Sequence, residues 1–309
     1  MTTNAELVLD TVIRRGAVTR PELALETGLS RGTIAGIIGF LHRSGLVDES
    51  STASGEVGRP RQTARPSPSV VALAVCIGAD RLRMGVVGLD GTVHQRIECP
   101  WAARSSRETV NTVAAVAEAV GISGTRRMAG IGVVAECAGR DAPEIARQLA
   151  ARLGLPAYSA SDGAAGAIAE GMFGAGSATR DMVYLDRRPD GALTGGAIVD
   201  GTLAQGQGGL DAHSHRVLGL ESGQTSAIVR TLCSLLDPET VVLGGGLADE
   251  LERIQSDVER DAVEDGRSSP RVVLSGLAAD APLIGGARLV FGRLLTETST
   301  RVAAAGHRN

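Results

Sequence analysis

Residues 18–47 place the strongest constraint on the fold, because they combine two short helix patterns with a tight turn between them. Thr19 and Glu22 form a capping box around Pro21, and Gly28 then ends the first helix. Ser30 caps a second helix, in which apolar residues recur at intervals of three and four. The pattern predicts a helix-turn-helix whose buried stripe consists of Ile34, Ile37, Ile38 and Leu41.

The exposed side of the predicted second helix carries short side chains and one arginine. Arg31 lies near the helix N-terminus, and Thr33 and Gly36 share its side. Gly32, Gly36 and Gly39 each cost the helix about 1 kcal/mol relative to alanine, a cost that close approach to another backbone would explain; neutral drift of the sequence is the alternative. Such a face suits a helix that lies in a DNA major groove. A small helical protein-interaction domain is the alternative, since fold does not fix function.

The segment that follows predicts a β-wing and a basic arm. Leu46 and Val47 begin an apolar strand, and the polar residues 48–57 form a plausible wing tip. Arginines then stand beside glycine and proline in an extended stretch, an arrangement that can enter a minor groove. An ordinary solvated linker is the alternative for this stretch. The predicted DNA-binding residues are Thr19, Arg20, Ser30, Arg31, Gly32, Thr33, Gly36, Arg59 and Arg61, with Arg65 a further cation of the arm.

Charge gives only weak support for DNA binding. Residues 1–66 contain 8 arginines and 7 acidic residues, a net charge of +1, whereas the whole chain carries −4 and the remainder therefore −5. DNA-binding domains are usually more basic than this. The chain as a whole has a globular composition, with 43% hydrophobic and 21% charged residues.

The cysteines indicate a reducing compartment. Cys76, Cys99, Cys137 and Cys233 lie far apart, without a CxxC pair, and fit buried thiols better than disulfides or a zinc site. The first residues predict an amphipathic helix rather than a signal peptide, and no apolar run reaches transmembrane length. We expect a cytoplasmic protein with no membrane partner and no metal.

At 309 residues the chain is long enough for more than one domain. Beyond the segment 51–69, rich in Ser, Gly and Pro, strand patterns followed by alternating helices and strands occur twice. This succession predicts an α/β body of two lobes with a cleft. We expect a winged helix-turn-helix and linker at 1–66 and a body at 67–309, with lobes at about 70–165 and 181–283 and a C-terminal helix at 284–297.

Several motifs together resemble the ROK family (repressor, open reading frame, kinase). The two more specific ones are the segment around Asp162, within residues 153–176, and LLDPETVVLGGGLA at 235–248. The others are GRP at 58–60, the hairpin at 72–93, residues 182–206 and the C-terminal LIGGARLVF. With the N-terminal helix-turn-helix, the chain is similar to the xylose- and N-acetylglucosamine-type repressors of that family. The resemblance covers nearly the whole chain and implies an actin-like ATPase fold, whose lobes enclose a sugar site in the relatives.

Departures from the ROK pattern argue against phosphoryl transfer. The resemblance aligns the kinase phosphate loop Asp-x-Gly-Gly-Thr with residues 76–80, where Cys76 replaces the metal carboxylate and Asp80 stands near the phosphates. The second phosphate loop aligns with Asp190-Gly191-Ala192, which adds another acid. Phosphoryl transfer depends on neutralising phosphate charge, and these residues supply the opposite. We therefore expect no enzyme activity and no cofactor.

The sugar and zinc motifs are also reduced. The family's Glu-Asn-Asp run, whose aspartate is the general base, corresponds to Ala160-Ser161-Asp162. Asp162 could instead be only the N-cap of the following Ala-rich helix. Of the segment that holds zinc in relatives, only His215 is kept, and His213 with His215 cannot supply about four ligands. The candidate residues for a small ligand are Ser161, Asp162 and His215, and the resemblance implies that this ligand is sugar-like.

Two hypotheses follow. The first is a DNA-binding transcriptional regulator, expected to be a repressor and a homodimer or higher oligomer, whose catalytically inactive body serves dimerisation and possible sensing of a small molecule. The second is an ATP-dependent sugar kinase with a regulatory DNA-binding head. The phosphate-loop substitutions favour the first.

Overall fold

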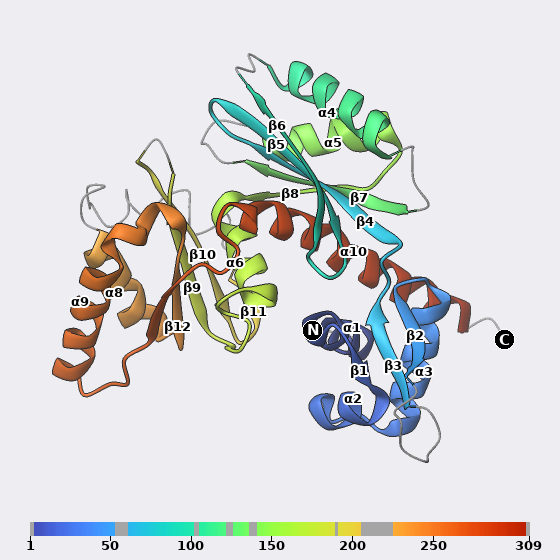
Figure 1. The fold of residues 1–309 in the computed structure, drawn as a ribbon, viewed down its shortest axis with the longest axis horizontal. Helices are drawn as coiled ribbons and strands as arrows, with labels where there is room; N and C mark the ends of the chain where they lie inside the picture. Colours follow the sequence, from blue (N-terminus) through green and yellow to red (C-terminus); the bar gives the residue numbers. More distant parts are fainter. Residues whose placement is uncertain are drawn as a thin grey trace.

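The computed structural model describes residues 3–52, 61–101, 105–121, 126–135, 141–188, 191–204 and 225–306. Figure 1 shows a small N-terminal domain, here called the head, below a larger body with two sheets. The body consists of lobe 1, built on the sheet β6-β5-β4-β7-β8, and lobe 2, built on β11-β10-β9-β12-β13. This confirms the predicted α/β fold with a winged head and a two-lobed body.

The head has the predicted helices and a three-stranded sheet. Its core is formed by the apolar faces of all three helices, including Leu9, Leu23, Ile34 and Leu41. Strand β3 lies between β1 and β2 and is antiparallel to both. The elements are α1 (Asn4–Arg15), β1 (Val18–Thr19), α2 (Arg20–Thr27), α3 (Arg31–Arg43), β2 (Val47–Thr52) and β3 (Arg61–Pro66).

Strand β3 is the main difference from the expectation for the head. Residues 61–66 are not a free arm or linker, because Val47 pairs with Pro66 and Val18 with Ala64. The predicted wing tip also begins later, since residues 48–52 belong to β2. Only the short stretch 67–69 separates β3 from the first strand of the body.

Lobe 1 is a mixed sheet covered on both faces. Strand β4 is buried along its whole length, which explains its continuous apolar sequence. Leu73, Val75 and Ile77 face α4 and α5, whereas Ala72, Ala74 and Cys76 pack in the cluster that contains α10. The elements are β4 (Val70–Ile77), β5 (Arg81–Gly88), β6 (Val93–Pro100), α4 (Ser106–Gly121), β7 (Arg127–Ala135), α5 (Ala142–Leu153) and β8 (Ala157–Ser161).

Lobe 2 repeats this two-sided arrangement. Val183 and Leu185 of β9 pack with α8 and α9, and Tyr184 between them packs with α6. Strands β9, β12 and β13 are parallel, whereas β10 and β11 are antiparallel additions. The elements are β9 (Met182–Arg187), β10 (Leu193–Val199), β11 (Thr202–Leu203), α8 (Thr225–Leu236), β12 (Thr240–Leu243), the 3-10 helix η1 (Gly245–Glu250), α9 (Leu251–Glu264) and β13 (Arg271–Leu274).

Helices α6 (Asp162–Phe173) and α10 (Ala281–Gly306) join the two lobes. They cross closely, because a side chain at Gly285 would meet the carbonyl oxygen of Ala165 at 1.9 Å. Helix α10 follows the short 3-10 helix η2 (Ala278–Asp280) and runs along the sheet of lobe 1 on the side opposite α4 and α5 (Figure 1). It begins earlier and ends later than the predicted 284–297, since neither Gly nor Pro interrupts residues 293–305.

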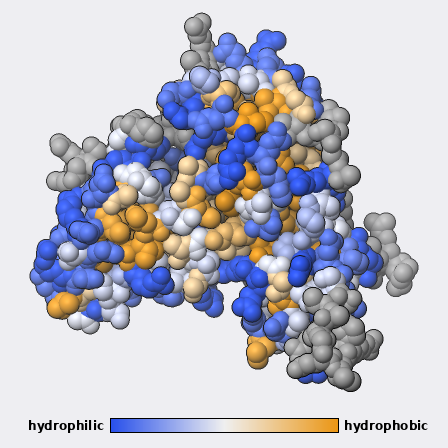
Figure 2. All heavy atoms as spheres, viewed as in Figure 1, coloured by the Kyte–Doolittle hydropathy of each residue, from blue (hydrophilic) through white to orange (hydrophobic). Residues whose placement is uncertain are grey.

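The surface matches this layering. Figure 2 shows polar residues over most of the outer helices and apolar residues gathered toward the centre of the same view, where head, lobes and α10 meet. Among the described residues, no helix is long and apolar enough to cross a membrane.

Candidate nucleic-acid interface and lobe junction

The turn between α2 and α3 is fixed by side-chain caps at both helix starts. The Thr19 backbone N–H donates to Glu22 Oε2 at 2.8 Å, and the Glu22 N–H donates to Thr19 Oγ1 at 3.4 Å. The Ser30 hydroxyl accepts from the Thr33 N–H at 3.1 Å, and the two hydroxyls lie 2.8 Å apart. Gly28 has the left-handed backbone expected at the end of α2. Thr19, Ser30 and Thr33 therefore shape the helix-turn-helix, whatever else they contact.

Helix α3 has one buried and one exposed face. Ile34, Ile38 and Leu41 are fully buried in the head, while Ile37 is only partly buried. The opposite face contains every predicted contact residue of this helix. These exposed residues are Arg31, Gly32, Thr33, Ala35 and Gly36.

The glycines of α3 are not required by the fold. A side chain at Gly36 would meet no atom within 4 Å, and one at Gly32 would meet only the Ser30 hydroxyl at 3.8 Å. In the body, by contrast, a side chain at Gly132 would meet the backbone of Gly286 at 2.0 Å. Glycine at the exposed positions weakens the helix and gives the isolated protein no packing in return. The face is therefore smooth enough for another molecule to lie against it.

Arg20 is engaged within the head. Its guanidinium donates to Glu49 of β2 through Nε at 3.0 Å and through Nη2 at 2.8 and 2.9 Å. This pair ties the start of α2 to the wing, and the side chains are only 35% and 17% exposed. A phosphate contact by Arg20 would have to compete with Glu49. The sequence could not indicate this pairing, because it depends on how the wing folds back.

The wing carries the remaining cations. Arg65 is exposed on β3, directly across from Asp48 of β2. Arg61 begins β3 opposite Thr52, so its backbone is part of the sheet rather than of an arm. Arg59 lies outside the described residues, as does the side chain of Arg61.

At the junction of the lobes, Asp162 is buried and bonded to lobe 2. Its side chain is about 7% exposed, its Oδ1 accepts from the Thr194 hydroxyl at 2.6 Å, and its Oδ2 lies 3.6 Å from Arg188. The cap of α6 is Ser161, whose hydroxyl accepts from the Ala164 N–H at 3.4 Å, so the reading of Asp162 as N-cap is wrong. His213 and His215 lie outside the described residues.

These contacts limit what Asp162 can do. A general base needs a lone pair within reach of the proton that it removes. Here Oδ1 already accepts from Thr194 and from the Gly163 N–H at 2.9 Å, and Oδ2 faces the Arg188 guanidinium. A sugar hydroxyl at this position would have to displace part of that network.

The segment that resembles a phosphate loop contains one buried thiol and one exposed carboxylate. Cys76 is fully buried in the apolar cluster beside α10. Asp80 is exposed in the turn between β4 and β5, 3.5 Å from Arg81. In the part of the chain that the structure describes, no three His, Cys, Asp or Glu side chains gather as a metal site. Asp190 lies outside that part, next to Gly191 of the β9–β10 hairpin.

Asp186 is a half-buried carboxylate that the sequence analysis did not single out. It accepts from the Arg187 N–H at 2.8 Å, from the Gly246 N–H at 3.1 Å and from the Tyr184 hydroxyl at 3.3 Å. Burial is the main cause that raises the pKa of Asp186 and of Tyr184. A side chain at Gly244 would collide with Asp186 at 2.1 Å. Two of the three glycines at 244–246 thus have a structural use: Gly244 leaves room for Asp186, and a side chain at Gly246 would meet the Arg187 carbonyl oxygen at 2.0 Å, whereas one at Gly245 would meet no atom within 4 Å.

The fold, a winged head on a two-lobed body, is similar in whole or in part to known structures. A ROK family transcriptional regulator, a homologue of the E. coli MLC protein, aligns with a TM-score of 0.71 over 96% of this chain and 98% of its own, at 16% identity. A ROK family glucokinase from Streptomyces griseus, solved with glucose and AMPPNP, aligns with a TM-score of 0.54 over 71% of this chain and 98% of its own, at 19% identity. A ROK hexokinase from Thermus thermophilus aligns with a TM-score of 0.56 over 70% of this chain and 96% of its own, at 18% identity.

These likenesses confirm the expected fold. The regulator covers nearly the whole chain, head included, whereas the two kinases cover about seven tenths of it. No known protein family matches the sequence by its profile, and no curated protein sequence matches it. At identities below one fifth, structural similarity shows the fold alone.

Proposed function

We propose that this protein is a DNA-binding transcriptional regulator whose body does not phosphorylate sugars. The observation that carries the proposal is the exposed face of α3, on which glycines that the fold does not need surround Thr33, with Arg31 at the helix start. The regulator that shares the whole architecture supports it.

In the proposed mechanism, α3 lies in the major groove and Arg31 reads base edges. The DNA phosphate backbone lies against the start of α2 and the hydroxyls of Ser30 and Thr33. The wing follows the DNA backbone or minor groove through Arg59, Arg61 and Arg65. Residues 1–66 are the DNA-binding unit, and the body at 67–309 joins two copies. The protein acts in the cytoplasm, as a repressor.

The body is proposed to sense rather than to catalyse. Asp162 is held by Thr194 and Arg188, and Cys76 is buried away from any ligand. A small sugar-like effector at Ser161 and Asp162 would act by binding one arrangement of the lobes better than another, because equal affinity shifts nothing. His215 remains a candidate for the same site.

A sugar kinase with a regulatory head is the second candidate, because the glucokinase and the hexokinase share the fold of the body. Turnover of ATP measured with glucose, N-acetylglucosamine or xylose separates the two. We expect none above the background of an Asp162→Asn variant. Clear phosphorylation would overturn the proposal for the body.

The DNA-binding proposal is tested by in vitro selection of bound duplexes with the full chain. Arg31→Ala should reduce discrimination between selected and scrambled DNA by about 1–3 kcal/mol, while Arg59→Ala should weaken binding to all sequences alike. Arg81→Ala, an exposed arginine of the body, is the matched control and should bind as wild type. If no duplex binds at moderate salt, the function is refuted. If only the variants fail to differ from wild type, the contact assignment is wrong.

A further inference from the structure

The connection between head and body is short and bonded on both sides. Three residues, 67–69, join β3 to β4 and can span at most about 11 Å. The Ser67 N–H donates to the carbonyl oxygen of Leu46 in the head at 3.0 Å. The carbonyl oxygen of Ser69 accepts from the Arg127 N–H of lobe 1 at 2.6 Å. Ser67 itself is 2% exposed, so this linker does not behave as a free tether.

A second link joins α1 to α10. Asp10 forms an ion pair with Arg288, and the two side chains are only 26% and 12% exposed. Desolvation raises the pKa of Asp10 against the attraction of Arg288 and Arg14, so the carboxylate depends on these guanidinium groups for its charge. Helices α1 and α10 also share one apolar cluster, to which Leu9 and Phe291 belong.

A third link reaches the proposed recognition helix itself. The Arg127 guanidinium of β7 donates to the carbonyl oxygen of Ser44, the C-cap residue of α3, at 3.4 Å. A cation at a helix C-terminus also interacts favourably with the helix dipole. Lobe 1 therefore contacts the end of α3 opposite to Arg31.

Beside the link between Asp10 and Arg288, head and body are separated by an open groove. The groove has a volume of about 1210 Å³ and runs between α1, α6, the β10–β11 turn and α10. Its walls include Asp10, Arg288 and Arg293. Across the groove, the Arg14 guanidinium donates to the Ser177 carbonyl oxygen in a long hydrogen bond of 3.5 Å. Because the groove interrupts the packing, a few contacts beside it determine the orientation of the head.

We propose that Asp10, Arg288 and Arg127 form a clamp that holds α3 at one orientation relative to the body, and that they are positioning residues for DNA binding. The inference rests on the proposed function. In a dimer held together by the bodies, a fixed head gives the two recognition helices a fixed separation. The clamp therefore sets which spacing of DNA half-sites is bound, whereas it adds nothing to the binding of one half-site.

The test compares spacing preference with affinity for a single half-site. Selected operators are lengthened by about 5 base pairs, half a helical turn, between their half-sites. For wild type we expect affinity to fall at least about tenfold on lengthening. For Arg288→Gln the fall should shrink to about twofold, with single half-site affinity unchanged. Arg293→Gln, an exposed arginine five positions further along α10, is the matched control and should behave as wild type.

Amide hydrogen exchange supplies a readout that does not need DNA. In Arg288→Gln, exchange should accelerate in α1 and at residues 67–69, but not in the sheet of lobe 1. The exchanged pair Asp10→Arg with Arg288→Asp should restore both slow exchange and the spacing preference. A variant that fails to fold would lose protection in lobe 1 as well, and Arg127→Gln then serves as the second probe.

The outcomes separate the two proposals. If wild type binds DNA but shows no spacing preference, or if Arg288→Gln and Arg127→Gln keep it, the clamp is refuted and DNA binding stands. If wild type binds no duplex, the proposed function fails. Amide hydrogen exchange alone then tests whether the clamp links head and body. Unchanged exchange in α1 of both variants refutes it.

Discussion

Gly36 lies at the middle of the exposed face of α3, where its missing side chain leaves open space rather than room for a neighbour. A side chain added at this position should affect stability and binding in opposite ways. It would stabilise the helix in the free protein, but it would weaken the binding of a closely docked partner. This makes single substitutions at α3 informative about function.

We predict that Gly36→Ala raises the free energy of unfolding by about 1 kcal/mol, since alanine favours the helix and meets no clash. Gly36→Gln should also fold, yet it should weaken DNA binding at least about tenfold, because its longer side chain prevents close approach to the groove. Denaturant unfolding and DNA titration measure the two effects. Tight DNA binding by Gly36→Gln would contradict the proposed docking of α3.

Asp162 allows a different prediction at the same scale. Asp162→Ala removes the acceptor of Thr194 and the counter-charge of Arg188, and should lower the free energy of unfolding by about 2 kcal/mol. Asp162→Asn keeps an acceptor for Thr194 and should lose about half as much. Unfolding in urea measures both. An Asp162→Ala protein as stable as wild type would show that the bonds to lobe 2 contribute nothing.

At the scale of the elements, one carboxylate of α6 binds the segment that connects β13 to α10. Glu170 is fully buried, and it accepts from the Ser275 hydroxyl at 2.5 Å, the Leu277 N–H at 3.1 Å and the Ala175 N–H at 2.8 Å. On the other side, Arg83 donates to the Ala279 carbonyl oxygen at 2.8 Å and Arg96 pairs with Asp280. The segment that connects lobe 2 to α10 is thereby held by α6 and by lobe 1.

We predict that Glu170→Ala lowers the free energy of unfolding by about 3 kcal/mol, because it leaves several half-buried donors without their acceptor. Glu170→Gln keeps one acceptor oxygen and is the control, with a smaller loss. Thermal unfolding followed by circular dichroism measures the difference. Equal stabilities of the two variants would mean that the bonds of Glu170 do not hold this segment.

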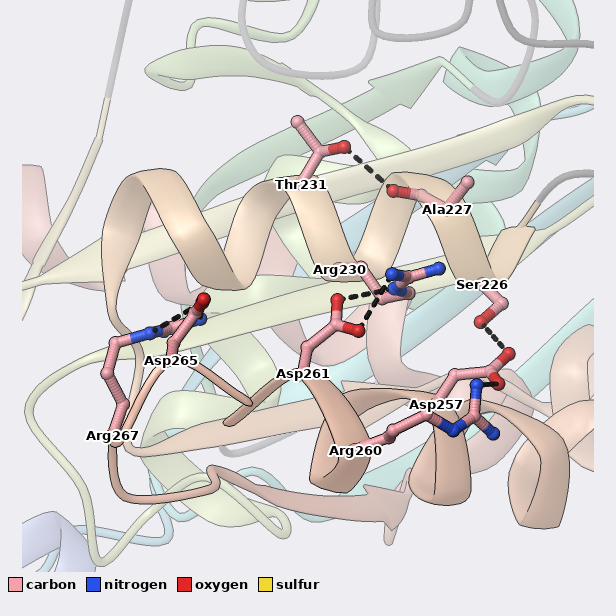
Figure 3. Close-up of polar contacts among 9 residues, drawn as sticks. All are labelled: Ser226, Ala227, Arg230, Thr231, Asp257, Arg260, Asp261, Asp265 and Arg267. Carbon is pink, nitrogen blue, oxygen red and sulfur yellow. Dashed lines mark hydrogen bonds and ion pairs between the residues drawn. The ribbon is translucent and has the colours of Figure 1, made fainter. Parts of the chain in front are cut away.

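Helices α8 and α9 are joined by a row of polar contacts, shown in Figure 3. Arg230 binds Asp261 at 2.5 and 2.7 Å, and the Ser226 hydroxyl donates to Asp257 at 2.5 Å, with Arg260 3.1 Å from the same carboxylate. The hydrogen bond from Ser226, followed by the charges of Arg260 and Arg230, lowers the pKa of Asp257. The contacts of Asp257 therefore stabilise the helix pair more when this carboxylate is ionised.

A pH dependence follows from the sign of this shift. Because the pKa of Asp257 is lower in the folded protein than in the unfolded chain, its contribution is present above its ordinary pKa of about 4 and is lost as the pH falls below it. The melting temperature should thus fall less between pH 6 and pH 3 for Asp257→Asn than for wild type. Asp265→Asn, at an exposed pair beyond the end of α9, is the control. Identical pH profiles for Asp257→Asn and wild type would rule out this role.

At the scale of the whole molecule, the sequence predicted what local chemistry determines. The caps at Thr19 and Ser30 and the left-handed Gly28 were visible because they involve neighbours in the chain. The alternating faces of the body strands were visible as apolar runs. Strand β3 was missed because RQTARP is polar and ends in proline, and its pairing with β1 and β2 is decided by the fold of the head.

The candidate site was predictable to the same extent. The exposed face of α3 followed from helical periodicity, and the structure places Arg31, Thr33 and Gly36 on it. The partner of Arg20 lies 29 residues away and that of Asp162 on β10 lies 32 residues away, so neither could be inferred from spacing. Arg288 had no signal at all, since its only distinguishing feature is contact with α1.

The bond between Asp10 and Arg288 spans 278 positions of the chain, and so it links α1 to the much later α10. At translation rates of about 5–20 residues per second, α1 waits roughly 15–55 s for its counterpart to leave the ribosome. The head can therefore fold before the contact that orients it relative to the body is able to form. In chains truncated upstream of α10, the ion pair between Asp10 and Arg288 could not form, and the head would lack this contact with the body.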